Sequence, residues 1–384
     1  MRLTLKTRPL LRVLALAQKI IERKPLIPAL ENFKFGHDDR GYYVMGSSSE
    51  HSLRLTLEVS FCEGEFFDFL VSAAELVGVL STIESEVIYM DVDKSGGSVK
   101  VDYQTGKFVL PSAKANDYPL PVFNDVGVMS FSCNYSEVCK SVSAALHYVA
   151  FDELRPVMMG VALDVKEDGF TVVGTNGHLL YKRPFDVGAP FVKQGSPSVI
   201  ILPVNAVKVL EAVFGGAENV DVDCNAQKVK FHSDDAEFII TRVEGKYPNY
   251  GSVFPANTAF SITVPLSELK KSVRRTSLFV ANTASRMLVL EFSKEGGLHI
   301  KAENIDFGQQ CDDKLADDSL TLSGNIPGNF AIGVKSDSLS TILGDIKSAD
   351  VTMNFVDATR AVVVREANPE SSLQMLLMPM LLHD

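Results

Sequence analysis

The sequence lacks the features that mark membrane-spanning and disulfide-bonded proteins. Its 384 residues contain no run of about 18 apolar residues, so we expect no membrane span. The five cysteines are odd in number and include no CxxC pair, which argues against a disulfide framework and against a zinc site. Free thiols are typical of a reducing compartment, and we therefore expect a cytoplasmic protein.

The sequence also lacks the common motifs of catalysis and nucleotide binding. There is no GxxxxGKS/T or GxGxxG loop to hold phosphates, and no HExxH or GxSxG motif. In DVDKSGGSVKVD, Asp91, Asp93 and Asp102 occupy positions of a calcium-binding loop. Strands flank this segment where helices should be, so a β-hairpin is the better interpretation. His178 has no nucleophile or acid beside it, and we predict a protein that is not an enzyme and needs no metal or cofactor.

Net charge gives a conflicting indication about the binding partner. The formal net charge is −11, which on its own argues against nucleic acid. A net charge is only a sum, however, and a basic surface can be segregated on an acidic protein. The positions of lysine and arginine along the chain therefore matter more than their total.

A threefold repeat runs along the chain. Residues 7–24, 135–154 and 265–282 each carry apolar side chains three or four positions apart, with basic side chains between them. This pattern predicts amphipathic helices. The three segments begin about 128 residues apart, a third of the chain, which indicates three copies of one structural unit.

A second set of helices repeats in the same way. Residues 72–84, 203–216 and 335–348 are predicted to be helical, and Ser72 and Ser336 are placed to act as N-caps. Each segment is followed by alternating stretches with Gly, Asn or Asp turns, which predict antiparallel hairpins. Each third is thus predicted to contain strands, a helix, strands, a second helix and strands.

The last strand of each third is predicted to end at a proline that follows a bulky residue. The three dipeptides are Tyr118-Pro119, Tyr247-Pro248 and Met378-Pro379. They lie about 130 residues apart, so the apolar C-terminus is the third copy of a strand end and not a loose tail.

The repeats predict three α+β domains. We place them at 1–122, 123–256 and 257–384, with linkers near residues 116–126 and 254–260. In each domain two helices would pack on one face of an antiparallel sheet.

Positive charge gathers on the first helix of each third. The middle copy is the weakest, with Lys140 and His147. The outer copies carry Arg8, Arg12, Lys19, Arg23 and Lys24, and then Lys270, Lys271, Arg274 and Arg275. Such helices contact phosphates without reading sequence, and the scarcity of aromatic residues among them favours duplex over single-stranded DNA. A solvated charged face is the alternative for any single helix, and the repetition weakens it.

Four segments carry a resemblance to a known family: KPLIPALENFKF (24–35), GFTVVGTNGHLLY (169–181), GKYPNYGSVFP (245–255) and LLMPML (376–381). In this order they resemble the bacterial β sliding clamps, the processivity factors of the replicative DNA polymerase. The resemblance covers the whole chain. It implies a head-to-tail homodimer of three-domain subunits, closed as a six-domain ring with sheets outside and two helices per domain inside. Duplex DNA would pass through the ring while the clamp tethers the polymerase.

The resemblance also implies a pocket for short partner peptides, often with a Gln and a Leu-Phe end. Through it the replicative polymerase, the clamp loader and repair polymerases would bind. Carried over by motif, the pocket residues are Arg155, Met158, Thr175, Gly177, His178, Leu180, Pro248, Val253, Leu377, Met378, Pro379 and Met380. The sequence departs from the family pattern at Asn176, Leu179, Ser252 and Leu381, and at the additional His383-Asp384. We expect a less cationic pocket with a shifted peptide preference.

The resemblance and the helix spacing together nominate residues for DNA contact and for the dimer seam. Lys24 matches a basic residue that precedes proline in the family. Spacing adds Arg8, Arg12, Lys140, Lys271, Arg274 and Arg275. The seam is expected between the first and third domains, through Phe108, Leu110, Leu278 and Phe279. A place in the ordinary hydrophobic core is an equally good interpretation of these four.

Two other classes of protein are alternatives. One is a DNA-modifying enzyme that shares the fold, which the missing metal and nucleophile motifs argue against. The other is a scaffold of clamp fold that binds partner peptides without encircling DNA.

Overall fold

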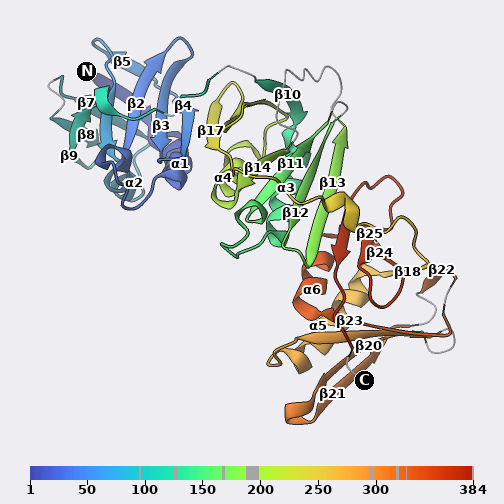
Figure 1. Cartoon of the computed structure of the whole chain (residues 1–384). Helices are drawn as coiled ribbons and strands as arrows, with labels where there is room; N and C mark the ends of the chain where they lie inside the picture. The colour runs from blue at the N-terminus through green and yellow to red at the C-terminus, as the bar shows by residue number, and fades with distance from the viewer. Residues whose placement is uncertain are drawn as a thin grey trace. The chain divides into compact units, whose positions relative to one another are not determined.

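The contacts within the chain divide it into two compact units, and Figure 1 labels many of their helices and strands. The computed structural model describes residues 1–94, 97–120, 122–124, 128–166, 169–186, 199–293, 297–316, 320–325 and 327–382. The first unit comprises Met1–Ser143, Val165–Asp168 and Val187–Glu244. The second comprises Ala144–Asp164, Gly169–Asp186 and Gly245–Asp384.

The helices and strands recur in the same order in each third. The first third contains β1 (Arg2–Lys6), α1 (Thr7–Ala17), β2 (Asn32–Asp38), β3 (Gly41–Ser47), β4 (His51–Thr56), β5 (Phe61–Glu63), β6 (Phe69–Ser72), α2 (Ala73–Leu80), β7 (Val87–Val92), β8 (Ser98–Tyr103) and β9 (Gly106–Lys114). The second contains β10 (Met129–Asn134), α3 (Tyr135–Ala145), β11 (Gly160–Val165), β12 (Gly169–Thr175), β13 (Leu179–Asp186), β14 (Val199–Pro203), α4 (Val204–Phe214), β15 (Asn219–Cys224), β16 (Lys228–His232) and β17 (Ala236–Thr241).

The last third repeats this order with one strand more than the second. It contains β18 (Phe260–Pro265), α5 (Leu266–Val280), β19 (Met287–Ser293), β20 (Gly297–Asn304), β21 (Gln309–Lys314), β22 (Thr321–Gly324), β23 (Asn329–Lys335), α6 (Ser336–Asp345), β24 (Asp350–Phe355), β25 (Val362–Glu366) and β26 (Gln374–Leu377). Neighbouring strands pair antiparallel. The α+β repeat predicted from the sequence is therefore confirmed.

In the first unit one sheet joins strands from the first and the second third of the chain. Its 13 strands have the order β10-β15-β16-β17-β4-β3-β2-β6-β9-β8-β7-β1-β5. The join is the pairing of β4 with β17, where Leu53 stands opposite Phe238 and both side chains are fully buried. The last strand of the second third thus continues the sheet of the first.

The second unit contains an equivalent join. Its strands follow the order β11-β12-β13-β26-β25-β24-β18-β22, and β21-β20-β19-β23 form a separate four-stranded sheet. β13 pairs with β26, with Leu180 opposite Leu376. In both units the third strand after the first helix of one third therefore pairs with the last strand of the next.

The first helices bury one face against these sheets. The buried residues are Thr7, Leu10, Leu14 and Ala17 in α1, and Leu266, Leu269, Ser272, Val273, Thr276 and Val280 in α5. α1 packs on β3 and β4, and α5 packs on β18 and β20. The spacing of three or four residues is the amphipathic pattern predicted from the sequence. The opposite faces are left for the basic side chains.

The first predicted helix is shorter than its periodicity indicates. α1 ends at Ala17, one 3₁₀ turn (η1, Gln18–Ile20) follows, and Ile21 is extended. The apolar pattern thus outlasts the helix, and Pro25 further disfavours helical backbone at the residue before it. Lys24 consequently lies in a loop and not on a helix.

The second predicted helix also ends early, at Ala145, and a 3₁₀ turn (η4, Leu146–Tyr148) follows it. The four other predicted helices are present with slightly trimmed ends. Ser72 is the N-cap of α2, as predicted, because its hydroxyl accepts a hydrogen bond from the Glu75 amide at 3.4 Å. The matching prediction for Ser336 is wrong: it is the first residue of α6, and the residue before it occupies the cap position.

The segment that resembles a calcium-binding loop forms the predicted hairpin. β7 and β8 pair antiparallel with Val92 opposite Val99. Residues 95–96 of its turn lie outside the described residues. So do Val126 at the end of the first predicted linker and the terminal residues 383–384.

The proline prediction is correct for the third repeat and wrong for the first two. β9 ends at Lys114 and β17 at Thr241, several residues before their prolines, whereas β26 ends one residue before Met378. Tyr118 and Tyr247 are buried, and each hydroxyl reaches a strand carbonyl at 3.4 or 3.5 Å. Met378, in contrast, is 40% exposed.

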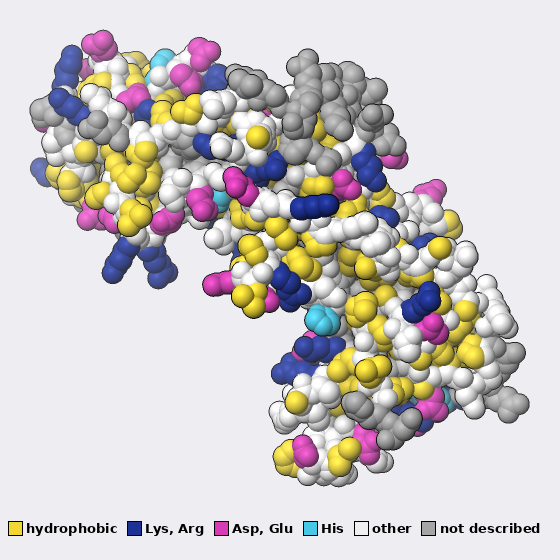
Figure 2. Space-filling model, in the orientation of Figure 1, with side chains coloured by type: hydrophobic (Ala, Val, Ile, Leu, Met, Phe, Trp, Pro, Cys, Tyr) yellow, Lys and Arg dark blue, Asp and Glu magenta, His cyan; other side chains and the backbone are white. Residues whose placement is uncertain are grey.

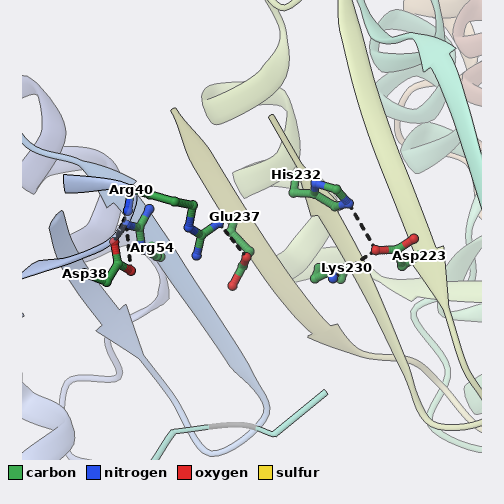
Figure 3. A network of polar contacts seen from close by, with 7 residues as sticks. All are labelled: Asp38, Arg40, Arg54, Asp223, Lys230, His232 and Glu237. Atoms are coloured by element: carbon green, nitrogen blue, oxygen red, sulfur yellow. Dashed lines mark hydrogen bonds and ion pairs between the residues drawn. The ribbon is translucent and has the colours of Figure 1, made fainter. Parts of the chain in front are cut away.

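Polar side chains reinforce the join between β4 and β17 (Figure 3). Arg40 reaches across to Glu237, with 3.0 Å between Nη1 and Oε2. Glu237 stands opposite Arg54 in the strand register. The almost fully buried Arg54 donates two hydrogen bonds to Asp38, at 2.8 and 2.9 Å. Because these residues come from β17, β4 and the β2–β3 hairpin, they link the first third of the chain to the second.

A second polar cluster lies on β10, β15 and β16 of the same sheet (Figure 3). Asp223 lies 3.0 Å from His232 Nε2 and 2.9 Å from Lys230 Nζ, and it accepts a hydrogen bond from Ser130 at 2.6 Å. The contact with His232, supported by Ser130 and Lys230, holds the pKa of Asp223 well below its usual range, against the opposing effect of burial. The Asp223 carboxylate therefore stays charged and ties three strands together.

His51 is a buried titratable group at the start of β4. It is 6% exposed, and its ring meets Phe238 edge-on with the ring centres 6.2 Å apart. Among the described residues its Nδ1 has no hydrogen-bond partner, and the Glu50 carboxylate is 3.8 Å from its Nε2. Burial lowers the pKa of His51, against the smaller opposing effects of Glu50 and Glu22. The folded protein thus favours the neutral imidazole.

We predict that mild acid destabilises the protein through His51. The unfolded chain takes up a proton below about pH 6.5, whereas the folded chain resists protonation. The free energy of unfolding should therefore fall as the pH drops below about 6.5, and His51 should contribute no pH dependence above it. Asp223 acts in the same direction only near about pH 4 and below.

Urea unfolding of the wild type and His51→Gln between about pH 7.5 and 5 measures this effect. The wild type should lose stability more steeply than the variant. His37→Gln, which changes an exposed histidine, is the control and should follow the wild type. Parallel curves for the wild type and His51→Gln would contradict the prediction.

Candidate nucleic-acid and partner-peptide surfaces

The exposed face of α1 carries predicted cations of the first third. Arg8 and Arg12 are exposed and four residues apart, so they share one face of the helix. The buried Leu10 and Leu14 lie on the face that packs against the sheet. In the described part of the chain neither arginine has an ion-pair partner, whereas Arg2 on β1 pairs with Asp91. The α1 cations are therefore available to phosphates.

Lys24 lies exposed in the loop after η1, next to an apolar tip that the sequence analysis missed. Leu26 is fully exposed and Ile27 is 47% exposed. Two large apolar side chains directly after Arg23 and Lys24 are the sequence signal that could have identified this tip. The loop presents positive charge and apolar surface together.

The predicted cations of α5 point in different directions. Lys271 and Arg274 are exposed. Arg275 instead turns toward β21 and contacts Asp313, with 2.5 and 3.1 Å from Nη2 and Nε to Oδ2. Successive helix residues are about 100° apart, so residues 274 and 275 cannot share a face. Asp313 already neutralises Arg275 in the free protein.

A groove of about 570 Å³ runs between α5 and α6. Lys270, Arg274 and Arg286 line it. Arg286 is held by Asp337 of α6 at 2.6 Å, while Lys270 and Arg274 have no ion-pair partner among the described residues. This groove adds two unpaired cations to the exposed side of α5.

The middle third contributes less charge, as the sequence indicates. Lys140 is exposed on α3. His147 on η4 lies 3.3 Å from Asp345 of α6 and is thereby engaged. Figure 2 shows basic side chains projecting beneath α1 and α2 of the first unit, and others over α5 and α6 of the second. Each unit thus presents part of its positive charge over helices.

The turn between β12 and β13 is held in one conformation by its own side chains. Thr175 donates a hydrogen bond to the Leu179 carbonyl at 2.8 Å and accepts one from the Gly177 amide at 3.2 Å. Asn176 accepts from the amides of His178 and Leu179 at 2.9 and 2.8 Å. Gly177 has φ of +89°, a conformation that side chains disfavour. The turn projects His178 into solvent.

Arg155 and Met158 lie against this turn. Arg155 donates a hydrogen bond from Nη1 to the Asn176 carbonyl at 3.3 Å and contacts Asp152 at 3.3 Å. A Cβ on Gly177 would lie 3.1 Å from Arg155 Nη1 and 3.7 Å from Met158 Cε. The segment around η5 (Pro156–Met158) therefore packs directly on the turn.

The C-terminus meets the same turn from the other side. Beyond the Leu179–Leu377 pair, the Met378 amide donates to the His178 carbonyl at 2.9 Å. The Met380 amide then donates to the Gly333 carbonyl on β23 at 2.7 Å. The end of the chain is thus fixed at two points.

The corner at residues 245–255 is tied to the β12–β13 hairpin. Tyr247 reaches the Val173 carbonyl of β12 at 3.5 Å, and Lys182 of β13 lies 4.8 Å from the ring centre of Phe254. Pro248 is half-buried in this corner, and Val253, in η6 (Tyr250–Val253), is 48% exposed. The motif residues from four separate segments therefore belong to one structural neighbourhood, which we call the turn–terminus surface.

Not all motif residues reach this surface. Thr175, Leu180 and Leu377 are at most 5% exposed, so they support the turn from below. Arg155, Gly177, His178, Val253 and Met378 are exposed, and Met158 is buried. Phe151 and Leu154 are 84% and 88% exposed in the loop before Arg155, and the sequence analysis missed them. Two apolar residues in the acidic segment AFDELRP were their only signal.

The residues predicted at the dimer seam differ in exposure. Leu278 on α5 is 73% exposed and Phe279 is half-buried. On β9 Phe108 is half-buried and Leu110 is 8% exposed, whereas Val109 between them is 59% exposed. Within one chain Leu110 is thus mainly a core residue, and Val109 is a large apolar side chain that β9 presents to solvent.

The described residues contain no group of side chains arranged to hold a metal ion. All five cysteines are free. Burial raises the pKa of Cys133 to about 12 and those of Cys139 and Cys224 to about 11, so these thiols stay protonated and unreactive. No described helix combines the length and apolar character needed to cross a membrane.

Comparison with known proteins identifies the family. Models of the N-terminal, central and C-terminal domains of the DNA polymerase III beta subunit match residues 1–122, 134–249 and 251–381. The beta sliding clamps of Pseudomonas aeruginosa and Caulobacter vibrioides are 24% and 25% identical to the chain; each alignment covers 99% of this chain and 100% of the relative.

The fold is shared with solved clamps. The crystal structure of the Pseudomonas aeruginosa sliding clamp bound to griselimycin superposes with a TM-score of 0.89 at 23% identity, over 100% of both chains. Three consecutive domain models therefore agree with a structural match over the full length. The chain belongs to the family of DNA polymerase III beta subunits, the sliding clamps that serve the replicative polymerase as processivity factors without catalytic activity.

Proposed function

We propose that the chain closes head-to-tail with a second copy into a ring around duplex DNA and tethers replication proteins through the turn–terminus surface. The domains at 1–122, 123–256 and 257–384 are the units of this ring. The ranges of the three family matches support these boundaries. The observation that carries the proposal is a pair of strand edges beside which the described part of the chain places no second strand.

The threefold repeat identifies these two edges. β4 pairs with β17 and β13 pairs with β26, in each case the third strand after a first helix with the last strand of the next third. The strand equivalent to β4 and β13 in the final third is β21, and β9 is the equivalent of β17 and β26. β21 ends its sheet, and among the described residues Gly106–Pro111 of β9 pairs only with β8. A second copy would satisfy both edges by the pairing used twice within the chain.

Helix contacts support the same closure. In the first unit α4, the second helix of its third, packs against α1, the first helix of the preceding third. If the same contact recurs between two copies, α2 of a second copy would pack against α5. That contact would cover the exposed Leu278. On β9 the exposed Val109 joins Phe108 as an apolar contact. An exposed strand edge beside exposed apolar side chains favours association over solvation.

We predict that Leu278→Asp weakens the dimer. A charge placed in an apolar seam loses the burial energy of leucine, about 1.5–3 kcal/mol, and adds a desolvation cost at both seams of the ring. Sedimentation equilibrium should show wild-type dimers and a monomer population for the variant, with the dimer dissociation constant raised at least about tenfold. Leu154→Asp, at another strongly exposed leucine, is the control. Equal dissociation constants would exclude Leu278 from the seam.

The exposed cations would contact the DNA backbone. Arg8, Arg12, Lys24, Lys271 and Arg274 are open to solvent, and Lys140 would add a contact from the middle domain. Arg275 is the weakest candidate because it would have to leave Asp313. Contacts of this kind neutralise phosphates without reading bases, so they hold the duplex and still let it slide. Retention would come from the closed ring and not from tight binding.

We predict that Lys24→Glu and Arg274→Glu each weaken DNA binding; because Arg274 lines the same groove as Leu278, sedimentation must show that its variant is still a dimer. Each lost phosphate contact should reduce the slope of log K against log salt by about 0.9. Fluorescence anisotropy with a labelled duplex at several salt concentrations measures the slope. Lys94→Glu, at a lysine that already pairs with Glu65 on the β7–β8 hairpin, is the control. Unchanged slopes in both variants would refute these contacts.

The turn–terminus surface would bind the peptide motifs of the replicative polymerase, the clamp loader and repair polymerases. It combines exposed Met378 and Val253 with His178 and the Arg155 guanidinium. Methionine suits a surface that serves several partners because its flexible thioether adapts its packing. The Pseudomonas aeruginosa clamp binds griselimycin, so a protein of this fold accepts a ligand. Asn176, Leu179, Ser252 and Leu381 would make peptide preference differ from that of relatives.

We predict that deleting the chain from Met378 onward abolishes peptide binding and spares the ring. The deletion removes the contacts at His178 and Gly333 but leaves β26 with both neighbouring strands. Anisotropy with a labelled peptide that has a Gln and a Leu-Phe end should show at least about a tenfold loss of affinity. Deleting only residues 381–384 is the milder control. Full affinity in the longer deletion would disprove the assignment.

A clamp-fold scaffold that never encircles DNA is the less favoured alternative. It would need neither the unpaired cations of α1 and α5 nor the two complementary strand edges. Peptide binding that persisted while every cation variant behaved as wild type would favour it.

A further inference from the structure

Close to the last described residue, the chain pairs with an edge strand of the four-stranded sheet. β23 is an edge strand of that sheet, paired on one side with β19. On its other side Gly333 and Met380 form an antiparallel bridge, in which the Met380 amide donates to the Gly333 carbonyl at 2.7 Å. The C-terminus therefore partly covers an edge that would otherwise be open.

Gly333 is the point at which the tail approaches most closely. A Cβ at this position would lie 2.9 Å from the Met380 carbonyl oxygen, 3.0 Å from Met287 Sδ and 3.1 Å from Leu382 Cδ2. The two side-chain atoms belong to flexible residues and could shift. The carbonyl oxygen belongs to the tail backbone, so it could move only if the tail moved.

Backbone conformation does not explain this glycine. Among the described glycines, Gly41, Gly64, Gly177, Gly245, Gly297, Gly308 and Gly324 have positive φ, and Gly333 does not. A side chain at Gly333 would meet no conformational penalty of that kind, and its strand neighbours on β23 are Ile332 and Val334. The missing side chain therefore serves the close approach of the tail.

The tail is anchored at both ends of a very short segment. Met378 is fixed at the β12–β13 turn through the His178 carbonyl at 2.9 Å, and Met380 is fixed at Gly333. Pro379 lies between them with its restricted φ. Two anchors and a proline leave the backbone of this segment little freedom, so the direction in which the Met378 side chain leaves the backbone is fixed, while the flexible thioether can still adapt to a partner.

We propose that Gly333 is a positioning residue of the turn–terminus surface. By leaving room for the Met380 carbonyl, it seats the C-terminal tail on β23 and holds Met378 and Met380 ready for a partner peptide. The proposal rests on the proposed peptide-binding function of that surface. A tail without this seat would have to be ordered when the peptide binds, and that cost would reduce affinity although no contact residue had changed.

The test compares Gly333→Ala and Gly333→Val with the wild type. Gly328→Ala, just before β23 and with no atom within 4 Å of the added Cβ, is the matched control. Hydrogen exchange of the C-terminal peptide, measured by mass spectrometry, reports whether the tail is seated. Anisotropy with the labelled peptide that has a Gln and a Leu-Phe end reports affinity. Sedimentation equilibrium shows whether each variant still forms the dimer.

We expect faster exchange of the tail and weaker peptide binding in both variants. The loss of affinity should be larger for Val than for Ala and reach about tenfold for Val. The dimer and the control should be unchanged. Unaltered exchange would show that Gly333 does not determine how the tail packs on β23. Altered exchange with unaltered affinity would show that this packing does not position the surface for the peptide. A wild type that binds no peptide would refute the peptide-binding function itself, while its exchange data would still test the seat.

A double-mutant cycle separates this role from general destabilisation. Gly333→Val is also made in the chain truncated before Met378, where no tail remains to be displaced. If valine acts only through the tail, it should leave the unfolding midpoint of the truncated chain unchanged, so the two changes are not additive. An equal loss of stability in both backgrounds would mean that valine disturbs β23 itself and would overturn the proposal.

Discussion

Pairing of exposed strand edges is the constraint on which the rest of this structure depends. A free edge presents unpaired amides and carbonyls, and proteins cover such edges or use them for association. Here each third of the chain has two strands whose edges pair beyond that third: the third strand after its first helix, and its last strand. Two joins, β4 with β17 and β13 with β26, use four of these edges within the chain. Among the described residues no strand lies beside the outer edge of β21 or beside Gly106–Pro111 of β9 on the side away from β8, and these two edges are complementary by the same rule. The proposed closed dimer would leave neither edge unpaired.

The separation of charge explains how a protein with net charge −11 can hold DNA. On the sheets many carboxylates are already paired, as Arg40 with Glu237 and Lys301 with Glu291 illustrate. On α1 the arginines have no such partners among the described residues. Unpaired cations attract phosphate, while paired ones contribute little to the long-range potential. A ring that combines weak, unspecific contacts with topological closure can slide and still remain bound.

Local and repeated features were predictable from the sequence, and tertiary contacts were not. Helical periodicity identified each of the α-helices that the described part of the chain contains, because the apolar face that packs on a sheet recurs every three or four residues. The helix ends failed where the apolar pattern continued past the structural signal, as before Pro25. Arg275 and Arg274 looked equivalent in the sequence, but only the structure reveals that Asp313 engages one of them. Likewise, motif likeness selected Thr175 and Leu180 without revealing that both are buried. Gly333 carries no local signal, since its role depends on a tail that lies far away in the sequence.

Retention on circular DNA tests encirclement most directly. The protein is assembled on a nicked circular duplex with its clamp loader, separated from free protein by gel filtration at moderate salt, and then exposed to a restriction enzyme that cuts the circle once. A topological ring should stay on the intact circle and leave after cutting, because only a closed ring is released by a DNA end. Equal retention on circular and linear DNA would contradict the account, since it would mean that direct contacts, and not closure, hold the protein on DNA.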